Sequence, residues 1–190
     1  MIRYIAALLA LLAASTALAQ QPFDPAKVIA AQREALAPFR YMDGVWRGTA
    51  LTLRPSGEKH VTTHTERVGP FLDGSVKVIE GRSYEEGGRV GFNALGIISY
   101  DVARKTYTLR SYALGRSGDF ALTPTADGYQ WEIPAGPGKT IRYVATVKDG
   151  TWYEVGDMLA AEARPVRIFE MTLKRVGDTD WPAANPVPQR

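Results

Sequence analysis

From residue 45 onward, apolar and polar residues alternate in short segments rich in Val, Ile, Thr and aromatic residues. Side chains on a strand point alternately to the two faces of a sheet, so this two-residue period predicts β-strands. Tight-turn sequences separate the segments, among them Asp127-Gly128 and Asp149-Gly150. The predicted strands are residues 45–54, 59–68, 75–84, 91–100, 106–113, 119–124, 129–133, 140–148, 151–158 and 166–176. About ten successive strands without an intervening helix predict an all-β fold, an up-and-down antiparallel sheet that closes into a barrel and leaves no exposed edge.

A helical pattern precedes the strands, within residues 20–42. Asp24 is suited to cap a helix and Pro25 to occupy its first position. Val28 and Leu36 recur at spacings that place them on roughly one face. We expect one short amphipathic helix packed on the domain, because its polar face lacks the Lys and Arg of a membrane-surface helix.

The first residues have the pattern of a secretory signal peptide. A basic residue, Arg3, comes before the apolar run 5–12, and the small-x-small sequence Ala17-Leu18-Ala19 follows. The run is too short to span about 30 Å of hydrocarbon, and the polar Gln20-Gln21-Pro22 comes after it. We expect cleavage after Ala19 and a periplasmic or secreted protein without a transmembrane anchor.

These patterns divide the chain into a signal peptide (1–19), a helical segment (20–42), one barrel domain (43–176) and a flexible C-terminal tail (177–190). The chain has 190 residues and is 45% hydrophobic, which is too apolar for a disordered protein. It has no cysteine, which excludes thiolate nucleophiles and cysteine-ligated metals. Its basic residues are scattered and its net charge is only +3, so we expect no nucleic-acid partner.

The first predicted strand opens with Gly44-x-Trp46-x-Gly48 directly after the helical segment. This arrangement resembles the opening motif of lipocalins and the wider calycin group, in which the Trp closes one end of the barrel and a basic residue of the last strand packs over it. Arg175 matches that second position. Together with segments 69–74, 95–101 and 169–175, the motif resembles a bacterial lipocalin-like family of unknown function. The resemblance implies a lipocalin-like barrel with Trp46 and Arg175 as closing residues.

Haem barrels of the nitrobindin type share the same opening, but they supply a histidine ligand from the late part of the barrel. The only histidines here are His60 and His64, both on the second predicted strand. The resemblance therefore implies the fold without haem, and we predict no cofactor. Four residues along a strand separate Cα atoms by about 13 Å, so the two histidines are unsuited to share a metal ion. We expect them to face solvent and predict no metal site.

Charged and aromatic residues on the predicted strands are the candidate ligand contacts. Glu80 and Arg82 share a face with Val76 and Val78, so they would form a polar anchor if that face is internal. The alternatives are a structural ion pair or an outward-facing pair. The candidate ligand-binding residues are Glu80, Arg82, Arg110, Tyr112, Trp131 and Glu154.

Three functions remain compatible with the sequence. A barrel offers a concave apolar site, which favours binding of a small hydrophobic or amphipathic molecule. An enzyme could instead use Glu80 and Glu154 for acid/base chemistry, although the motifs of serine hydrolases, nucleotide-binding loops and helical zinc sites are absent. An envelope interaction or stress protein without a small-molecule ligand is the third.

Overall fold

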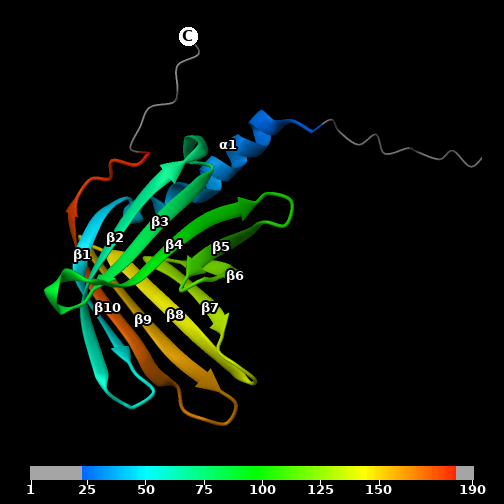
Figure 1. The fold of residues 1–190 in the computed structure, drawn as a ribbon. Coiled ribbons are helices and arrows are strands. Elements are labelled where there is room, and N and C mark those ends of the chain that lie inside the picture. The colour runs from blue at the N-terminus through cyan, green and yellow to red at the C-terminus, as the bar shows by residue number, and fades with distance from the viewer. Residues whose placement is uncertain (1–22, 183–190) are drawn as a thin grey trace, which may run out of the picture.

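The computed structural model describes residues 23–182, and it is a closed barrel of ten antiparallel strands with one N-terminal α-helix (Figure 1). Each strand pairs with its neighbour in sequence, and β1 pairs with β10 to close the sheet. The strands are β1 Gly44–Leu53, β2 Lys59–Phe71, β3 Val76–Tyr84, β4 Val90–Asp101, β5 Thr106–Ala113, β6 Arg116–Thr125, β7 Gly128–Pro134, β8 Lys139–Lys148, β9 Thr151–Ala160 and β10 Val166–Gly177. The predicted fold class is confirmed. The predicted signal peptide, residues 1–19, lies outside the described residues.

Most strand ends lie within two residues of the prediction, except the end of β2, at Phe71 instead of residue 68, and the start of β6. Strand β6 begins at Arg116 instead of residue 119, because Leu114 and Gly115 both adopt positive φ, 53° and 74°. Ala113 pairs directly with Arg116 across this turn. Two consecutive residues with positive φ match the twist of a two-residue hairpin, so β5 and β6 run to its edge.

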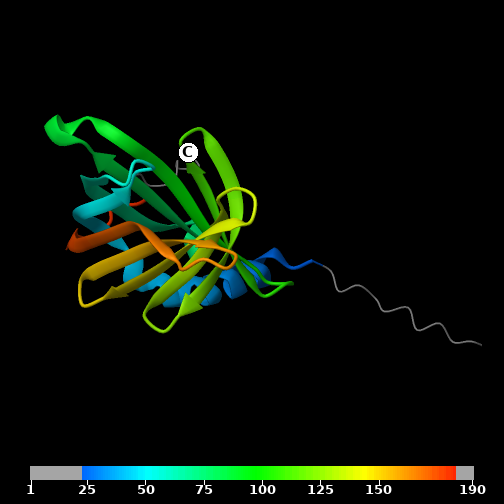
Figure 2. The same cartoon turned by 90° about the horizontal axis from the view of Figure 1, so that it is seen from below.

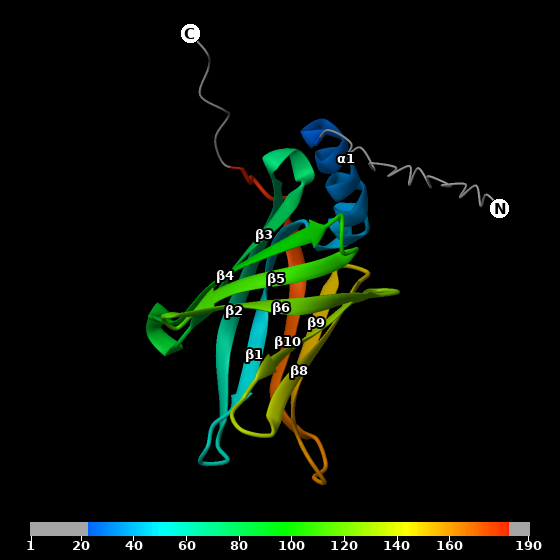
Figure 3. The same cartoon turned by 90° about the vertical axis from the view of Figure 1, so that its right-hand side faces the viewer.

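The helix α1 (Pro25–Leu36) and the short 3₁₀ helix η1 (Ala37–Met42) cover one end of the barrel. The Asp24 carboxylate accepts hydrogen bonds from the first amides of α1, as the sequence predicts. The hydroxyl of Tyr107 donates to the carbonyl of Ala35, and that of Tyr41 donates to the carbonyl of Gly128. Figure 3 shows α1 at the opposite end of the barrel from the β1–β2 and β9–β10 turns. Within residues 23–182, no helix has the length and apolar character needed to cross a membrane.

The hydrophobic core lies at the α1 end, where Phe39 and Met42 pack into the barrel. Trp46 is 1% exposed, and its ring makes an edge-to-face contact with Trp152 at 5.7 Å. Its indole N–H donates to the carbonyl of Met42 at 2.8 Å. Trp46 therefore plugs this end, as the calycin resemblance implies.

Arg175 lies across the β1–β10 ladder from Trp46. Its guanidinium donates to the carbonyl of Asp43 at 3.3 Å and pairs with Asp178. The resemblance implies that this guanidinium packs over the Trp46 ring, but among the described residues cation–π contacts are formed only by Arg67 and Arg110.

The chain after β10 returns to the barrel wall. Trp181 packs edge-to-face on Phe71 with ring centroids 5.6 Å apart, and the Arg67 guanidinium lies 5.6 Å from the Trp181 ring centroid. Arg67 also pairs with Asp180 at 3.3 Å. We predicted a flexible tail from residue 177, but Asp180 and Trp181 make these contacts with the barrel wall. The final residues, 183–190, lie outside the described part of the chain.

Candidate functional site

A cavity of about 920 Å³ occupies the part of the barrel away from α1. Its mouth lies where the strands meet the turns that face away from the helix, at residues such as Thr52, His60, Ala113 and Pro134. Figure 2 shows the molecule from the side of these turns. The packed core around Trp152 forms the base. The barrel is thus plugged at one end and hollow at the other.

One wall of the cavity is aromatic. Trp131 and Tyr143 stack with ring centroids 4.5 Å apart and an interplanar angle of 14°. Phe120 extends this wall on one side at 5.7 Å from Trp131, and Phe169 extends it on the other at 5.9 Å from Tyr143. A Cβ at Gly156 would lie 2.8 Å from the Tyr143 ring, so glycine is needed there. These rings offer a flat apolar surface to a ligand.

The opposite wall is polar and comes from β2 and β3. His64 is 4% exposed, with Nδ1 at 2.7 Å from Ser83 Oγ and Nε2 at 2.9 Å from Glu66 Oε1. A carboxylate only accepts, so we assign the Nε2 proton to the Glu66 bond, and Nδ1 then accepts from the Ser83 hydroxyl. A Cβ at Gly81 would lie 2.7 Å from Glu66, so this glycine leaves room for the carboxylate. The result is a buried Ser–His–Glu chain on the cavity wall.

The polar wall continues to the mouth, where His60 Nε2 lies 3.1 Å from a carboxylate oxygen of Glu85. We expected both histidines to face solvent, and that expectation is wrong, since β2 turns this face into the barrel. Within residues 23–182, no cluster of three or more His, Cys, Asp or Glu side chains is arranged to hold a metal ion.

Glu154 lies at the base of the cavity and is 7% exposed. The Tyr129 hydroxyl donates to its Oε2 at 3.1 Å, and the Trp131 indole N–H donates to its Oε1 at 3.2 Å. Burial raises the pKa of Glu154 to about 7, and the charge of Glu66 acts in the same direction, against these two donors. Burial also raises the pKa of Tyr129 well above its usual value, so its hydroxyl stays a donor. Glu154 can therefore gain or lose a proton near neutral pH.

Two buried side-chain atoms at the base lack a hydrogen-bond partner in the described part of the chain. They are Glu66 Oε2 and Trp152 Nε1, and both residues line the cavity. The Trp152 N–H lies close enough to Glu154 to favour its charged form, but it does not reach hydrogen-bonding geometry. An acceptor and a donor are thus left unpaired in one cavity, although most buried polar atoms are paired.

The structure places two of the predicted ligand-binding residues, Trp131 and Glu154, on the cavity wall. Glu80 and Arg82 instead lie on the outer face of β3, because their neighbours Ile79, Gly81 and Ser83 line the cavity. They pair with each other there, Arg82 Nε lying 3.0 Å from Glu80 Oε1. The interior anchor that we expected from this pair is therefore wrong, and the outward alternative holds.

Arg110 and Tyr112 also lie outside the barrel, on β5, where the interior positions are Leu109, Ser111 and Ala113. Arg110 Nε donates to the Tyr112 hydroxyl at 2.9 Å. Their expected place in the cavity is wrong, because flanking strand-forming residues do not reveal which face points inward.

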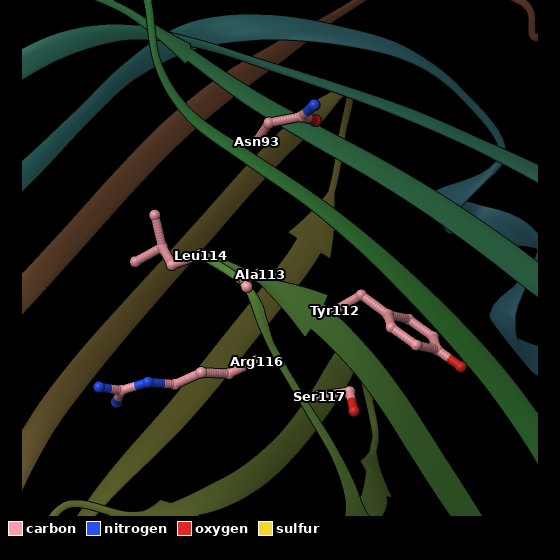
Figure 4. Close-up of a pocket in the computed structure, with 7 residues that line it drawn as sticks. Asn93, Tyr112, Ala113, Leu114, Arg116 and Ser117 are labelled. Atoms are coloured by element: carbon pink, nitrogen blue, oxygen red, sulfur yellow. The ribbon is translucent and has the colours of Figure 1, made fainter.

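A smaller open hollow of about 320 Å³ lies at the β5–β6 turn, where it is lined by Asn93, Tyr112 and Gly115. In Figure 4, the side chains of Tyr112 and Arg116 point in opposite directions from this hairpin. Arg116 lines both the hollow and the mouth of the barrel cavity, so the hollow is an outer margin of that mouth. The polar wall around His64 and the carboxyl of Glu154 line the barrel cavity and not this hollow.

No protein-family model matches the chain, and no curated protein sequence matches it. Solved structures do match its fold. One of them is the crystal structure of Rv2717c from M. tuberculosis, with a TM-score of 0.57 and 12% sequence identity over 75% of this chain and 97% of that chain. At this identity the similarity shows the barrel fold alone, because one fold supports many functions.

Proposed function

We propose that this protein is exported and binds a small, partly apolar molecule inside the barrel. The observation that supports binding is the one-ended cavity of about 920 Å³ with an aromatic wall on one side and a polar wall on the other. Ligand sites are typically concave, mainly apolar, and carry a few placed polar groups, with volumes of about 300–1,000 Å³. A barrel that served only as a scaffold would gain stability from filling this space with side chains.

Export is proposed from the sequence of the first nineteen residues. The basic start, the apolar run and Ala17-Leu18-Ala19 support it. Native mass spectrometry of protein purified from its own periplasm would test both parts of the proposal. The expected result is a chain that begins at Gln20 and carries additional mass from a retained molecule. A chain that retains its first residues argues against export, and a ligand-free mass after gentle purification argues against binding.

Filling the cavity is expected to weaken binding without unfolding the barrel. Ala94 lines the cavity on β4, whereas its neighbour Leu95 is exposed on the outer face. We expect Ala94→Trp to weaken binding of the retained molecule about tenfold or more, because the indole would occupy the same space. The matched Leu95→Trp variant adds the same ring outside and should bind as the original protein does. Ligand mass and thermal melting of both variants check this, and equal binding by the two would contradict a ligand in the cavity.

Acyl transfer is a second candidate, favoured by the Ser83–His64–Glu66 chain. A serine hydroxyl that donates to an imidazole held by a carboxylate is the arrangement that activates nucleophilic serines. All three residues line the cavity, so a substrate there would reach the Ser83 oxygen.

A fluorophosphonate probe separates this candidate from binding alone. If Ser83 is nucleophilic, its oxygen forms a bond to phosphorus, fluoride leaves and His64 takes the hydroxyl proton. The protein would then gain the mass of the phosphonyl group, and Ser83→Ala would not. Ser111 lines the same cavity outside the chain, so Ser111→Ala should still be modified. An unmodified original protein would eliminate the candidate and leave the binding proposal unaffected.

A further inference from the structure

The two unpartnered buried atoms of the described residues differ in kind. Glu66 Oε2 can only accept a hydrogen bond as a carboxylate oxygen, and Trp152 Nε1 can only donate one. Trp152 is 2% exposed and the Glu66 side chain is 12% exposed, so bulk water reaches neither readily. A buried polar atom without a hydrogen bond is unfavourable. These two atoms therefore favour a ligand group that donates to Glu66 Oε2 and accepts from Trp152 Nε1.

Glu66 and Trp152 share two neighbours at the base of the cavity, Trp46 and Glu154. Glu66 pairs with Trp46 across the β1–β2 ladder, and the Trp46 ring lies 5.7 Å from that of Trp152. Both residues also act on Glu154, where the Glu66 charge raises the pKa and the Trp152 N–H lowers it. Glu66 and Trp152 thus lie on two sides of the cavity base.

The chemistry of the two atoms selects among ligand groups. A hydroxyl both donates and accepts, so one oxygen can serve both atoms. An ammonium group has only donors and would leave the Trp152 N–H unpaired. A carboxylate would be repelled by Glu66 in a poorly solvated site. The aromatic wall above the base favours a flat apolar body over a strongly polar one.

We propose that the cavity base binds a neutral hydroxyl group on a flat apolar molecule, with the hydroxyl donating to Glu66 Oε2 and accepting from Trp152 Nε1. This assignment rests on the proposed binding function and names the class of its ligand, a phenol or an aryl alcohol. The hydroxyl lies at the base, the ring lies along Trp131 and Tyr143, and the remainder of the molecule points to the mouth.

Four probes that share one ring system test the assignment: naphthalene, naphthol, naphthoate and naphthylmethylammonium. Equilibrium dialysis against the full mature chain measures their affinities. Naphthol is expected to bind about tenfold more tightly than naphthalene, because a hydrogen bond to a charged acceptor in a desolvated site contributes about that factor. Naphthoate and the ammonium probe are expected to bind more weakly than naphthol.

Two variants remove the orphan atoms one at a time. Trp152→Phe keeps a ring and removes the N–H, and Glu66→Leu removes the acceptor; each is expected to reduce the preference for naphthol over naphthalene several-fold. Trp181→Phe makes the same change outside the cavity, where Trp181 packs on Phe71, and should preserve the preference. Thermal melting shows whether each variant is folded, and naphthalene affinity shows whether its cavity is intact.

The outcomes distinguish the assignment from the proposed function. Equal binding of naphthol and naphthalene, or a preference that survives Trp152→Phe, overturns the hydroxyl site while leaving a binding cavity. Tightest binding of the ammonium or the carboxylate probe overturns it in favour of a charged ligand. Failure of every probe to bind counts against the proposed function itself, and the hydroxyl site falls with it.

Discussion

Replacing Trp46 by alanine is expected to lower the free energy of unfolding by about 3–5 kcal/mol. Trp46 is 1% exposed, and it contacts both the Trp152 ring and the carbonyl of Met42. Its removal leaves a void that the closed sheet cannot collapse to fill, since β1 is held by hydrogen bonds on both edges. Chemical denaturation followed by far-ultraviolet circular dichroism measures the loss.

A phenylalanine at the same position separates the two contributions of Trp46. Trp46→Phe keeps an aromatic ring against Trp152 but leaves the Met42 carbonyl without its donor. We expect a smaller loss, about 1–3 kcal/mol. A loss below about 1 kcal/mol for Trp46→Ala would mean that the Trp ring does not plug the barrel, contrary to its burial.

The fold was predictable because its signals are local. Alternation over ten segments identified the strands, and turn sequences such as Asp127-Gly128 identified the hairpins. Hairpins in sequence order leave only one simple way for ten strands to pair, which is an up-and-down barrel. The resemblance of Gly44-x-Trp46-x-Gly48 to the calycin opening motif also predicted which end of the barrel is closed.

The cavity wall was harder to predict because it is polar. On β3, the apolar Val76 and Val78 suggested the inward face, yet Gly81 and Ser83 on the opposite face line the cavity. Hydrophobicity marks the inner face of a packed barrel, but a hollow barrel with a polar wall reverses that signal. A choice of the wrong face moves every side chain of a strand to the other side of the sheet, which is why Glu80 was misplaced.

One available signal would have located the polar wall. If Trp46 points inward, a hairpin centred on the Pro55-Ser56-Gly57 turn places Glu66 opposite it, and the structure has this pairing. His64 shares the face of Glu66, two residues away on the same strand. The hairpin register therefore connects the recognised tryptophan to the unrecognised site, without any conserved motif.

The buried carboxyl of Glu154 is expected to make stability fall as the pH rises. Its pKa is raised from 4.5 to about 7 in the folded protein, with burial as the main cause. Below pH 4.5 the group is protonated in both the folded and the unfolded chain. Between the two pKa values the unfolded chain loses this proton and the folded chain keeps it, so the free energy of unfolding decreases with increasing pH. The difference between the two pKa values corresponds to about 3 kcal/mol of the free energy of unfolding, and this whole contribution is lost once the pH is above the folded pKa.

Glu154→Gln is expected to remove this pH dependence, since a neutral amide replaces the titrating group. Urea denaturation gives the free energy of unfolding of both proteins at each pH. The value for the variant minus the value for the original protein should rise by about 3 kcal/mol between about pH 4 and about pH 9. Comparing the two proteins at each pH cancels the titration of groups that they share. Glu162 lies exposed in the β9–β10 turn, so Glu162→Gln should give a difference that stays flat. A flat difference for Glu154→Gln as well, or one of opposite sign, would show that the carboxyl at the cavity base is ionised without penalty.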